Sequence, residues 1–277
     1  MRKVVLVCLA AAFVPVGYGC KKKQKSSPPV IDTTSLPDAV EGTSYSYTVT
    51  ASGGRAANYQ WSATGLPTGL HIDASTGEIS GTPAAGSAGS HTVTITVTDG
   101  KRTTQKDFTL TVWQQLQITT TALQDGYEGQ TGYSATLAAT GGTGTYSWSM
   151  SGTLPANLGW DAATATISGD VAGGTAGIYA LQFEVTDGVQ RVTANLTLTV
   201  HAQLQITTTS LPAGYDGQTG YSATLGAIGG TGSYTWSVAS GNLPPNLNLD
   251  PSTGVISGDI GANASANSPY SITVEVT

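Results

Sequence analysis

The feature that most constrains the fold of this 277-residue chain is an internal repeat. Tryptophan recurs in closely similar settings, as Tyr-Gln-Trp-Ser around Trp61, Tyr-Ser-Trp-Ser around Trp148 and Tyr-Thr-Trp-Ser around Trp236. An Ile-Ser-Gly triplet follows each of these tryptophans, and equivalent landmarks are 87 to 89 residues apart. A period of this length is that of a whole domain, because the coils of a solenoid repeat every 20 to 45 residues or so.

Each repeat carries the alternating pattern of β-strands. Aliphatic residues and threonines alternate along residues 92–98 and 196–200, which is typical of strands with one face on a core and the other in water. Tyr59 and Trp61 are two positions apart and therefore face the same side, where a Trp fits the centre of a sandwich core. Short strands separated by turn signals predict an all-β fold of tandem immunoglobulin-like, cadherin-like β-sandwiches.

Tight hairpin loops are predicted at equivalent places in the first and third repeats. Residues 73–77 read Asp-Ala-Ser-Thr-Gly and residues 250–254 read Asp-Pro-Ser-Thr-Gly, with Gly at the position that needs a positive φ. The second copy has Ala165 in place of this Gly, so we expect its turn to differ slightly.

Four motifs of the first repeat strongly resemble the putative-Ig, cadherin-like repeats of bacterial surface proteins. They are Gly-Leu-Pro-Thr-Gly-Leu at 65–70, the Asp-to-Gly loop at 73–77, Ile-Ser-Gly-Thr-Pro at 79–83 and Val-Thr-Asp-Gly at 97–100. The likeness extends over residues 30–277, although the later copies replace the Thr-Pro after Ser-Gly by Asp-Val and Asp-Ile. The resemblance implies an extracellular β-sandwich module, often found in arrays, with no catalytic activity of its own.

The repeats and flanking compositions divide the chain into five parts. We expect a lipoprotein signal peptide at 1–19, a Lys/Ser/Pro tether at 20–29 and immunoglobulin-like repeats at 30–113, 114–201 and 202–277. The third repeat stops before the Asp-Gly turn and last strand of the other two, which predicts an open, unpaired sheet edge. Either the sequence is a piece of a longer array, or a partner supplies the missing strand.

The first twenty residues carry the pattern of an export signal. Basic residues at positions 2 and 3 precede an apolar stretch over 4–16, which is too short to span a membrane comfortably. The Gly-Cys pair at Gly19 and Cys20 resembles the lipobox of bacterial lipoproteins, although Gly17 stands where that motif usually has an aliphatic residue. We expect a lipidated Cys20 and a membrane-anchored lipoprotein of the bacterial envelope, at the outer membrane or cell surface. An ordinary secretory signal cut near the same place is the alternative.

Charge excludes a nucleic-acid partner. Six of the 11 basic residues lie in the first 25 positions, whereas all 17 acidic residues lie at Asp32 or beyond, so the folded part has a formal charge of −12. Binding to DNA or RNA requires clustered cations that displace phosphate counterions. The folded part would instead repel a polyanion.

A group of carboxylates recurs at equivalent loop positions and gives the candidate metal ligands. They precede a glycine in the loop near the start of each repeat or in the Asp-Gly turn: Glu41, Glu128, Asp216, Asp99 and Asp187. Calcium takes six to eight oxygen ligands, often carboxylates, and cadherins bind it between domains with acids at comparable loops. The linkers here lack the acidic linker motif of cadherins. The alternative is that these acids stabilise turns by accepting hydrogen bonds from nearby backbone N–H groups.

The other reactive or aromatic side chains give weaker signals. The three histidines, His71, His91 and His201, do not recur between repeats, and no Ser/His/Asp set suggests nucleophilic catalysis. We therefore expect no enzyme. Tyr127 and Tyr215 occupy the same loop of two repeats and could stack on sugar rings.

Three functional hypotheses follow from these patterns. The first is a structural array on a lipid anchor that spaces, presents or adheres at the cell envelope. The second is a binding module for a surface glycan or protein. The third is an accessory stalk for an enzyme domain beyond Thr277.

Overall fold

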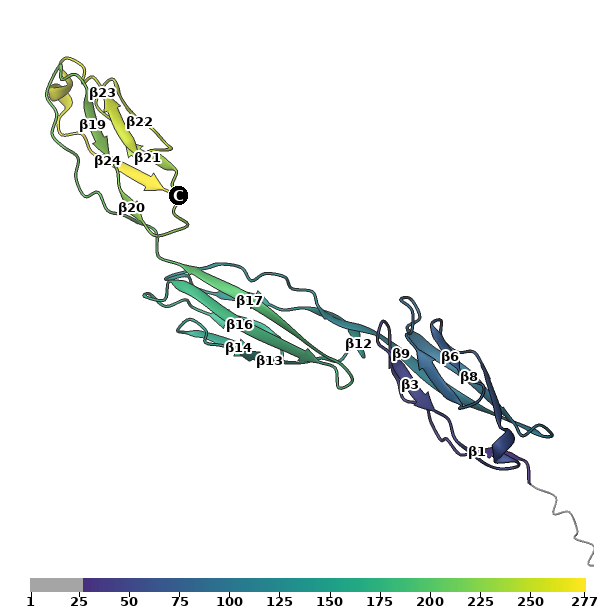
Figure 1. Cartoon of the computed structure of the whole chain (residues 1–277). Coiled ribbons are helices and arrows are strands. Elements are labelled where there is room, and N and C mark those ends of the chain that lie inside the picture. Colours follow the sequence, from purple (N-terminus) through teal and green to yellow (C-terminus); the bar gives the residue numbers. More distant parts are fainter. Residues whose placement is uncertain (1–26) are drawn as a thin grey trace, which may run out of the picture. The chain divides into compact units, whose positions relative to one another are not determined.

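The computed structural model describes residues 27–277, and these residues form β-strands joined by loops and two short 3-10 turns. One compact unit contains Thr43–Val112 and the described residues up to Ala39, and the other contains Val40–Gly42 and Trp113–Thr277. Figure 1 shows the strands of each repeat as a group of their own. No helix in the described part of the chain is long and apolar enough to cross a membrane.

The first repeat is a sandwich of two antiparallel sheets. One sheet has the order β9-β8-β5 and the other β3-β7-β6, while β1 pairs with β4. Strand β9 is 16 residues long; its residues up to Val112 pair with β8 and those from Gln114 on pair with β12. The strands are β1 (Pro29–Ile31), β2 (Ala39–Val40), β3 (Tyr45–Thr48), β4 (Ala51–Gly53), β5 (Gln60–Thr64), β6 (Leu70–Ile72), β7 (Glu78–Gly81), β8 (Gly89–Thr98) and β9 (Thr103–Ile118).

The second repeat has the same plan, and β10 pairs with β17 as β2 pairs with β9 in the first repeat. Its larger sheet has the order β10-β17-β16-β13, in which β10 and β17 run parallel, and its smaller sheet has the order β11-β15-β14. The strands are β10 (Gly126–Tyr127), β11 (Tyr133–Thr136), β12 (Ala139–Gly142), β13 (Ser147–Ser151), β14 (Leu158–Asp161), β15 (Thr166–Gly169), β16 (Gly177–Thr186) and β17 (Arg191–His201).

The third repeat keeps the smaller sheet and only part of the larger one. Strands β19-β23-β22 form a sheet, whereas β21 pairs with β24 in a sheet of two strands and β18 pairs with β20. No described strand lies in the place that β9 and β17 take in the other repeats. The strands are β18 (Gln205–Ile206), β19 (Tyr221–Thr224), β20 (Ala227–Ile228), β21 (Trp236–Gly241), β22 (Leu247–Leu249), β23 (Val255–Gly258) and β24 (Ile272–Val276).

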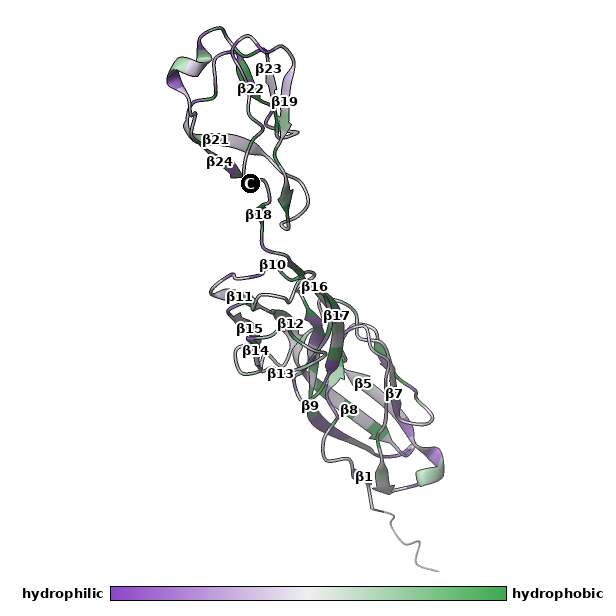
Figure 2. Ribbon diagram, turned by 90° about the vertical axis from the view of Figure 1, so that its left-hand side faces the viewer, coloured by the Kyte–Doolittle hydropathy of each residue, from purple (hydrophilic) through white to green (hydrophobic). Residues whose placement is uncertain are grey.

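Each repeat buries a hydrophobic core of its own, which explains why the alternating pattern recurs three times. In β8 the aliphatic side chains of Val93, Ile95 and Val97 are fully buried, and the intervening threonines remain half-buried. The strands accordingly carry hydrophobic and hydrophilic residues side by side (Figure 2). The predicted all-β fold of tandem immunoglobulin-like sandwiches is confirmed, and Trp61 packs in the first core with its ring edge-on to Tyr59.

Candidate functional site

The two Asp-Gly turns hold their carboxylates by backbone hydrogen bonds. Asp99, between β8 and β9, is fully buried; its Oδ1 accepts the N–H groups of Lys101 (2.9 Å) and Arg102 (2.7 Å), and the Arg102 guanidinium lies 3.4 Å from Oδ2. Asp187, between β16 and β17, accepts the N–H groups of Val189 and Gln190 in the same way.

These turns also join segments that are far apart in sequence. Oδ2 of Asp187 accepts the N–H of Thr143, 44 residues away, 2.8 Å from it. Burial favours the neutral acid at Asp99 and Asp187, but the surrounding N–H donors outweigh it, and both pKa values are lowered. The carboxylates are therefore ionised and act as acceptors that fix the turn.

The loop acids of the second and third repeats accept hydrogen bonds from a loop 48 or 49 residues further along the chain. Glu128 accepts the N–H of Ala176 through Oε1 (2.8 Å) and that of Gln203 through Oε2 (3.4 Å). Asp216 accepts both the N–H (2.7 Å) and the hydroxyl (2.6 Å) of Ser265. The Ala176 N–H at Glu128 and the Ser265 hydroxyl at Asp216 are the main reasons that the pKa of each acid is lowered.

Glu41 follows β2, and its backbone N–H donates to the carbonyl oxygen of Trp113 at 2.9 Å. The five candidate calcium ligands thus lie on five separate loops. Within residues 27–277, no three His, Cys, Asp or Glu side chains lie close enough together to hold a metal ion. The hydrogen bonds of Asp99 and Asp187 are those of the turn-stabilising alternative, whereas Glu128 and Asp216 join separate loops. Calcium binding stays a prediction.

The histidines lie apart from one another and have local partners. His71 Nε2 is 3.4 Å from the Ser80 hydroxyl, and His91 Nε2 is 2.8 Å from the Ser87 carbonyl oxygen. His201, at the end of β17, has its Nε2 2.8 Å from Asp125 Oδ2. The Tyr127 ring packs against the His201 imidazole with the ring centres 5.2 Å apart. This Asp–His–Tyr contact was not expected from the sequence, because its members do not recur in all repeats.

The two equivalent loop tyrosines are exposed to different degrees. Tyr127 is 42% exposed and contacts His201, whereas Tyr215 is 71% exposed. Trp160, which replaces an Ile of the first repeat, is half-buried and packs against Phe183 with ring centres 5.3 Å apart. Tyr215 is thus the more accessible surface for an aromatic contact with a ligand.

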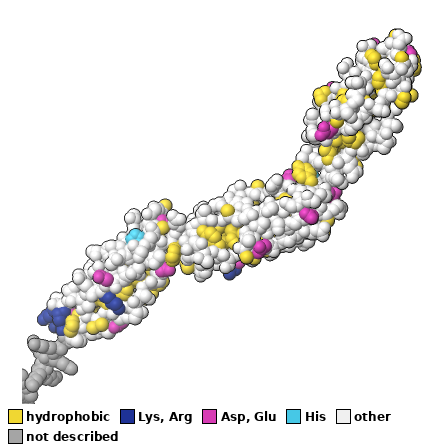
Figure 3. Space-filling model, turned by 180° about the vertical axis from the view of Figure 1, so that it is seen from behind, with side chains coloured by type: hydrophobic (Ala, Val, Ile, Leu, Met, Phe, Trp, Pro, Cys, Tyr) yellow, Lys and Arg dark blue, Asp and Glu magenta, His cyan; other side chains and the backbone are white. Residues whose placement is uncertain are grey.

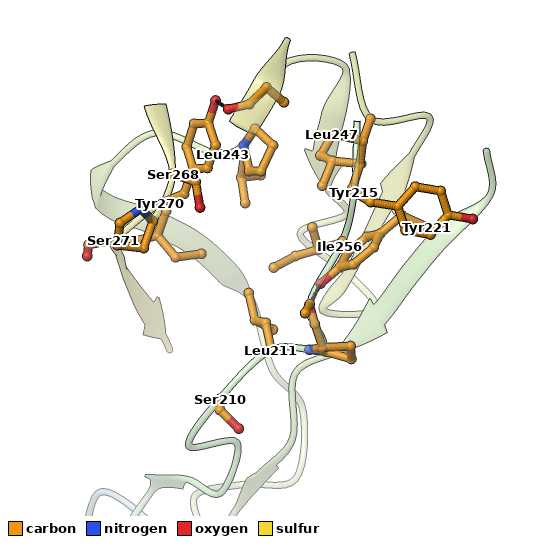
Figure 4. A pocket seen from close by; sticks show the side chains of 18 of the residues that line it. Ser210, Leu211, Tyr215, Tyr221, Leu243, Leu247, Ile256, Ser268, Tyr270 and Ser271 are labelled. Atoms are coloured by element: carbon orange, nitrogen blue, oxygen red, sulfur yellow. Dashed lines mark hydrogen bonds between the residues drawn. The ribbon is translucent and has the colours of Figure 1, made fainter. Parts of the chain in front are cut away.

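The described surface carries a groove of about 580 Å³ in the third repeat. Residues 208–216 line one side and residues 268–272 the other, with Tyr221, Leu247 and Ile256 among the apolar residues between them. Figure 4 shows Ser268 and Tyr270 facing Tyr215, Tyr221 and Leu247 across open space. In volume the groove is comparable to ligand sites of other proteins.

Charged side chains are sparse on the face shown in Figure 3, because only 10% of the residues in the sequence are charged. Residues 202–277 contain no Lys or Arg at all, while Asp216 lines the groove and Glu275 lies on β24. The groove therefore lies in an acidic environment.

Cys20 and the lysines that follow it lie outside the described residues, so lipidation stays a prediction.

Comparison with protein families finds three matches to one family description, "Putative Ig domain", over residues 28–113, 116–201 and 203–277. The chain belongs to this family. The Putative Ig domain repeats thus cover nearly all the described residues, in agreement with the resemblance of the first-repeat motifs. A search of curated proteins finds no match.

Several solved structures are similar to this Putative Ig domain chain at low identity. A putative alpha-galactosidase from Bacteroides fragilis is 29% identical over 31% of the chain with a TM-score of 0.28, and the chain spans only 17% of that protein. An I-band fragment of titin is 13% identical over 87% of the chain and 90% of the fragment (TM-score 0.42). The eight N-terminal Ig domains of Down Syndrome Cell Adhesion Molecule are 14% identical over 86% of the chain and 33% of that structure (TM-score 0.47).

Proposed function

We propose that this chain is an exported, lipid-anchored protein of the bacterial envelope whose immunoglobulin-like repeats act as a non-enzymatic spacer or adhesion array. The observation that carries the proposal is the order of its parts: a basic and apolar leader that ends just before Cys20, a Lys/Ser/Pro tether, and three Putative Ig domain repeats. Three repeats with separate cores give a module that extends a chain without requiring a catalytic site.

Metabolic labelling tests the anchor. We expect the full chain, produced in a bacterium with lipoprotein processing and fed an alkyne fatty acid, to become labelled and to fractionate with membranes. The Cys20→Ala variant should lose both properties while its repeats stay folded by circular dichroism. A wild-type chain that is cleaved and secreted without label would contradict the lipid anchor and support an ordinary secretory signal.

Surface display is tested separately on intact cells. Proteinase added outside should remove the repeats if the array faces the medium. Complete protection, lost on lysis of the outer membrane, would confine the protein to the periplasm and exclude a role in adhesion to other cells.

A glycan-binding role is the second candidate, and the exposure of Tyr215 favours it. Aromatic faces bury apolar area of a ligand at small entropic cost, which is why they anchor many binding surfaces. On a glycan array we expect any ligand bound by the wild-type chain to be lost in Tyr215→Ala and retained in Tyr127→Ala, because the Tyr127 ring packs on His201. An array without a hit would remove this candidate.

A further inference from the structure

Three of the five Lys and Arg residues that follow the tether gather around one turn of the first repeat. The buried carboxylate of Asp99 accepts the backbone N–H groups of Lys101 at 2.9 Å and Arg102 at 2.7 Å, and it also accepts that of Arg55. Arg55 and Lys101 are exposed, and within residues 27–277 no ion pair joins either of them to a carboxylate. We call Arg55, Lys101 and Arg102 the basic collar.

The second repeat builds the same turn without charge. There Asp187 accepts the backbone N–H groups of Thr143, Val189 and Gln190. These three residues take the places of the collar residues, and Thr143 follows a Gly-Gly pair as Arg55 does. The turn therefore forms without basic side chains, so the positive charge of the first repeat is not required by the fold.

The basic collar lies where the chain enters the first repeat. The carbonyl oxygen of Ser27, the first described residue, accepts the N–H of Gly54 at 3.0 Å, and Pro29 pairs with Gly53. Figure 3 shows Lys and Arg side chains gathered at this end of the described chain. The seven residues from Cys20 to Ser27 span at most about 25 Å when fully extended. A membrane-bound Cys20 would therefore keep the collar close to the membrane surface.

Charge distinguishes the collar from the rest of the described chain. Two carboxylates accompany its three cations: Asp99 is buried, and Asp32 accepts the Ser52 hydroxyl at 2.9 Å. The local formal charge is thus +1. In the remainder of residues 27–277, Lys106 and Arg191 are the only Lys and Arg beside the other 15 of the 17 acidic residues, which gives −13. The positive charge of the first repeat is concentrated at the end that follows the lysine-rich tether.

We propose that the basic collar binds the anionic headgroups of the membrane that holds the anchor and docks the first repeat on that surface. The inference rests on the proposed lipid anchor and adds a second contact with the membrane. An anionic surface attracts Lys and Arg within about one Debye length, roughly 8 Å at physiological ionic strength. Because the anchor gives the collar a high effective concentration at the surface, a contact of only three cations is sufficient.

Energy transfer from the protein to the membrane surface tests the docking. The lipidated product of the full chain, with a fluorescent donor on Ala56→Cys beside Arg55, is reconstituted into vesicles with an acceptor on a headgroup. We expect higher transfer with phosphatidylcholine and phosphatidylglycerol than with phosphatidylcholine alone, and loss of the difference in high salt. A donor on Ala85→Cys, which is also exposed but lies in the loop before β8, should give lower transfer in the anionic vesicles, because Asp99 follows the other end of β8.

Two substitutions separate the collar from the tether. Arg55→Thr together with Lys101→Gln removes two cations but keeps the backbone N–H groups that Asp99 accepts. Transfer from Ala56→Cys in anionic vesicles should then fall to the level seen with phosphatidylcholine alone. Arg191→Gln is the matched control, because it removes an exposed cation from the second repeat and should leave the transfer unchanged.

The possible outcomes distinguish the docking from the anchor. Equal transfer in neutral and anionic vesicles would overturn the docking and leave the anchor intact. A preference for anionic vesicles that survives the double substitution would also overturn it, by assigning the effect to the lysines at positions 21–25. A chain that stays in solution with both kinds of vesicle would overturn the anchor and, with it, this inference.

Discussion

At the residue scale, the last position of the hairpin loops at 73–77 and 250–254 shows how one Cβ atom affects a core. Gly77 has φ +75°, and a Cβ there would lie 2.9 Å from the Trp61 ring; Gly254 has φ +68° and the same relation to Trp236. Ala165 takes this place in the second repeat with φ +53°. Its partner Trp148 is half-buried, whereas Trp61 and Trp236 are buried. The backbone at this position is thus left-handed in all three repeats, and the difference between the repeats lies in the exposure of the tryptophan.

Exchange of these residues should have unequal effects. Gly77→Ala places a Cβ in the left-handed region, which costs about 1–2 kcal/mol, and presses it against Trp61, so we expect a loss of roughly 2–3 kcal/mol. Ala165→Gly relieves similar strain but removes a buried methyl group worth about 0.8 kcal/mol and adds chain entropy to the unfolded state. Its net change should be below about 1 kcal/mol. Urea unfolding followed by tryptophan fluorescence measures both; equal losses would refute the close-approach argument.

Calcium offers a second test at this scale. If Asp99 and its equivalents only fix turns, the melting temperature should be the same in EDTA and in millimolar calcium, because N–H donors already occupy their oxygens. If they bind calcium, the metal should raise the melting temperature as mass action requires, and Asp99→Asn should abolish that rise. Magnesium at equal ionic strength is the control.

At the element scale, one hydrogen-bonding pattern recurs in the loops that connect β6 to β7, β14 to β15 and β22 to β23. Asp73 accepts the N–H groups of Ser75 and Thr76 together with their hydroxyls. Asp250 accepts the N–H groups of Ser252 and Thr253 and the Ser252 hydroxyl. Asp161, in the equivalent loop of the second repeat, accepts the Ala163 N–H and the Thr164 hydroxyl. These contacts, led by the side-chain hydroxyls, lower the pKa of each acid.

Stability should therefore fall in acid. A carboxyl whose folded pKa is lowered stabilises the fold above its unfolded pKa of about 3.9, and this contribution is lost as the pH falls through that value toward the folded pKa. We expect the free energy of unfolding to be constant from pH 7 to about 5 and to drop below pH 4. Asp73→Asn should show a shallower drop than the wild type in the first repeat. An unchanged acid slope would contradict the role of this turn.

The elements also show which parts of the structure were predictable. Alternation in residues 92–98 correctly predicts the fully buried face of β8, because that pattern is set by each strand alone. Contacts between distant loops were not predictable: the Gln190 amide accepts the Leu116 N–H and donates to the Gln114 carbonyl, which only the folded register brings near. The groove itself required knowing how residues 208–216 lie against 268–272.

At the scale of the whole molecule, three separate cores predict unfolding in more than one step. The third repeat should unfold first, because its inward-facing residues on β24 are only half-buried while those of β8 and β16 are buried. Hydrogen exchange with mass spectrometry should show residues 203–277 opening at lower denaturant than residues 28–201. Simultaneous exchange of all three repeats would contradict this order and imply coupling between the cores.

The parallel pairing of β10 with β17 has a mechanical consequence. β10 lies early in the second repeat and β17 at its end, so tension on the two ends of that repeat pulls the paired strands in opposite directions along their length. Hydrogen bonds between such strands share the load in shear and must break together, instead of opening one after another like a zipper. Tension on the second repeat is therefore carried by this pair of strands and not by the loops that connect them.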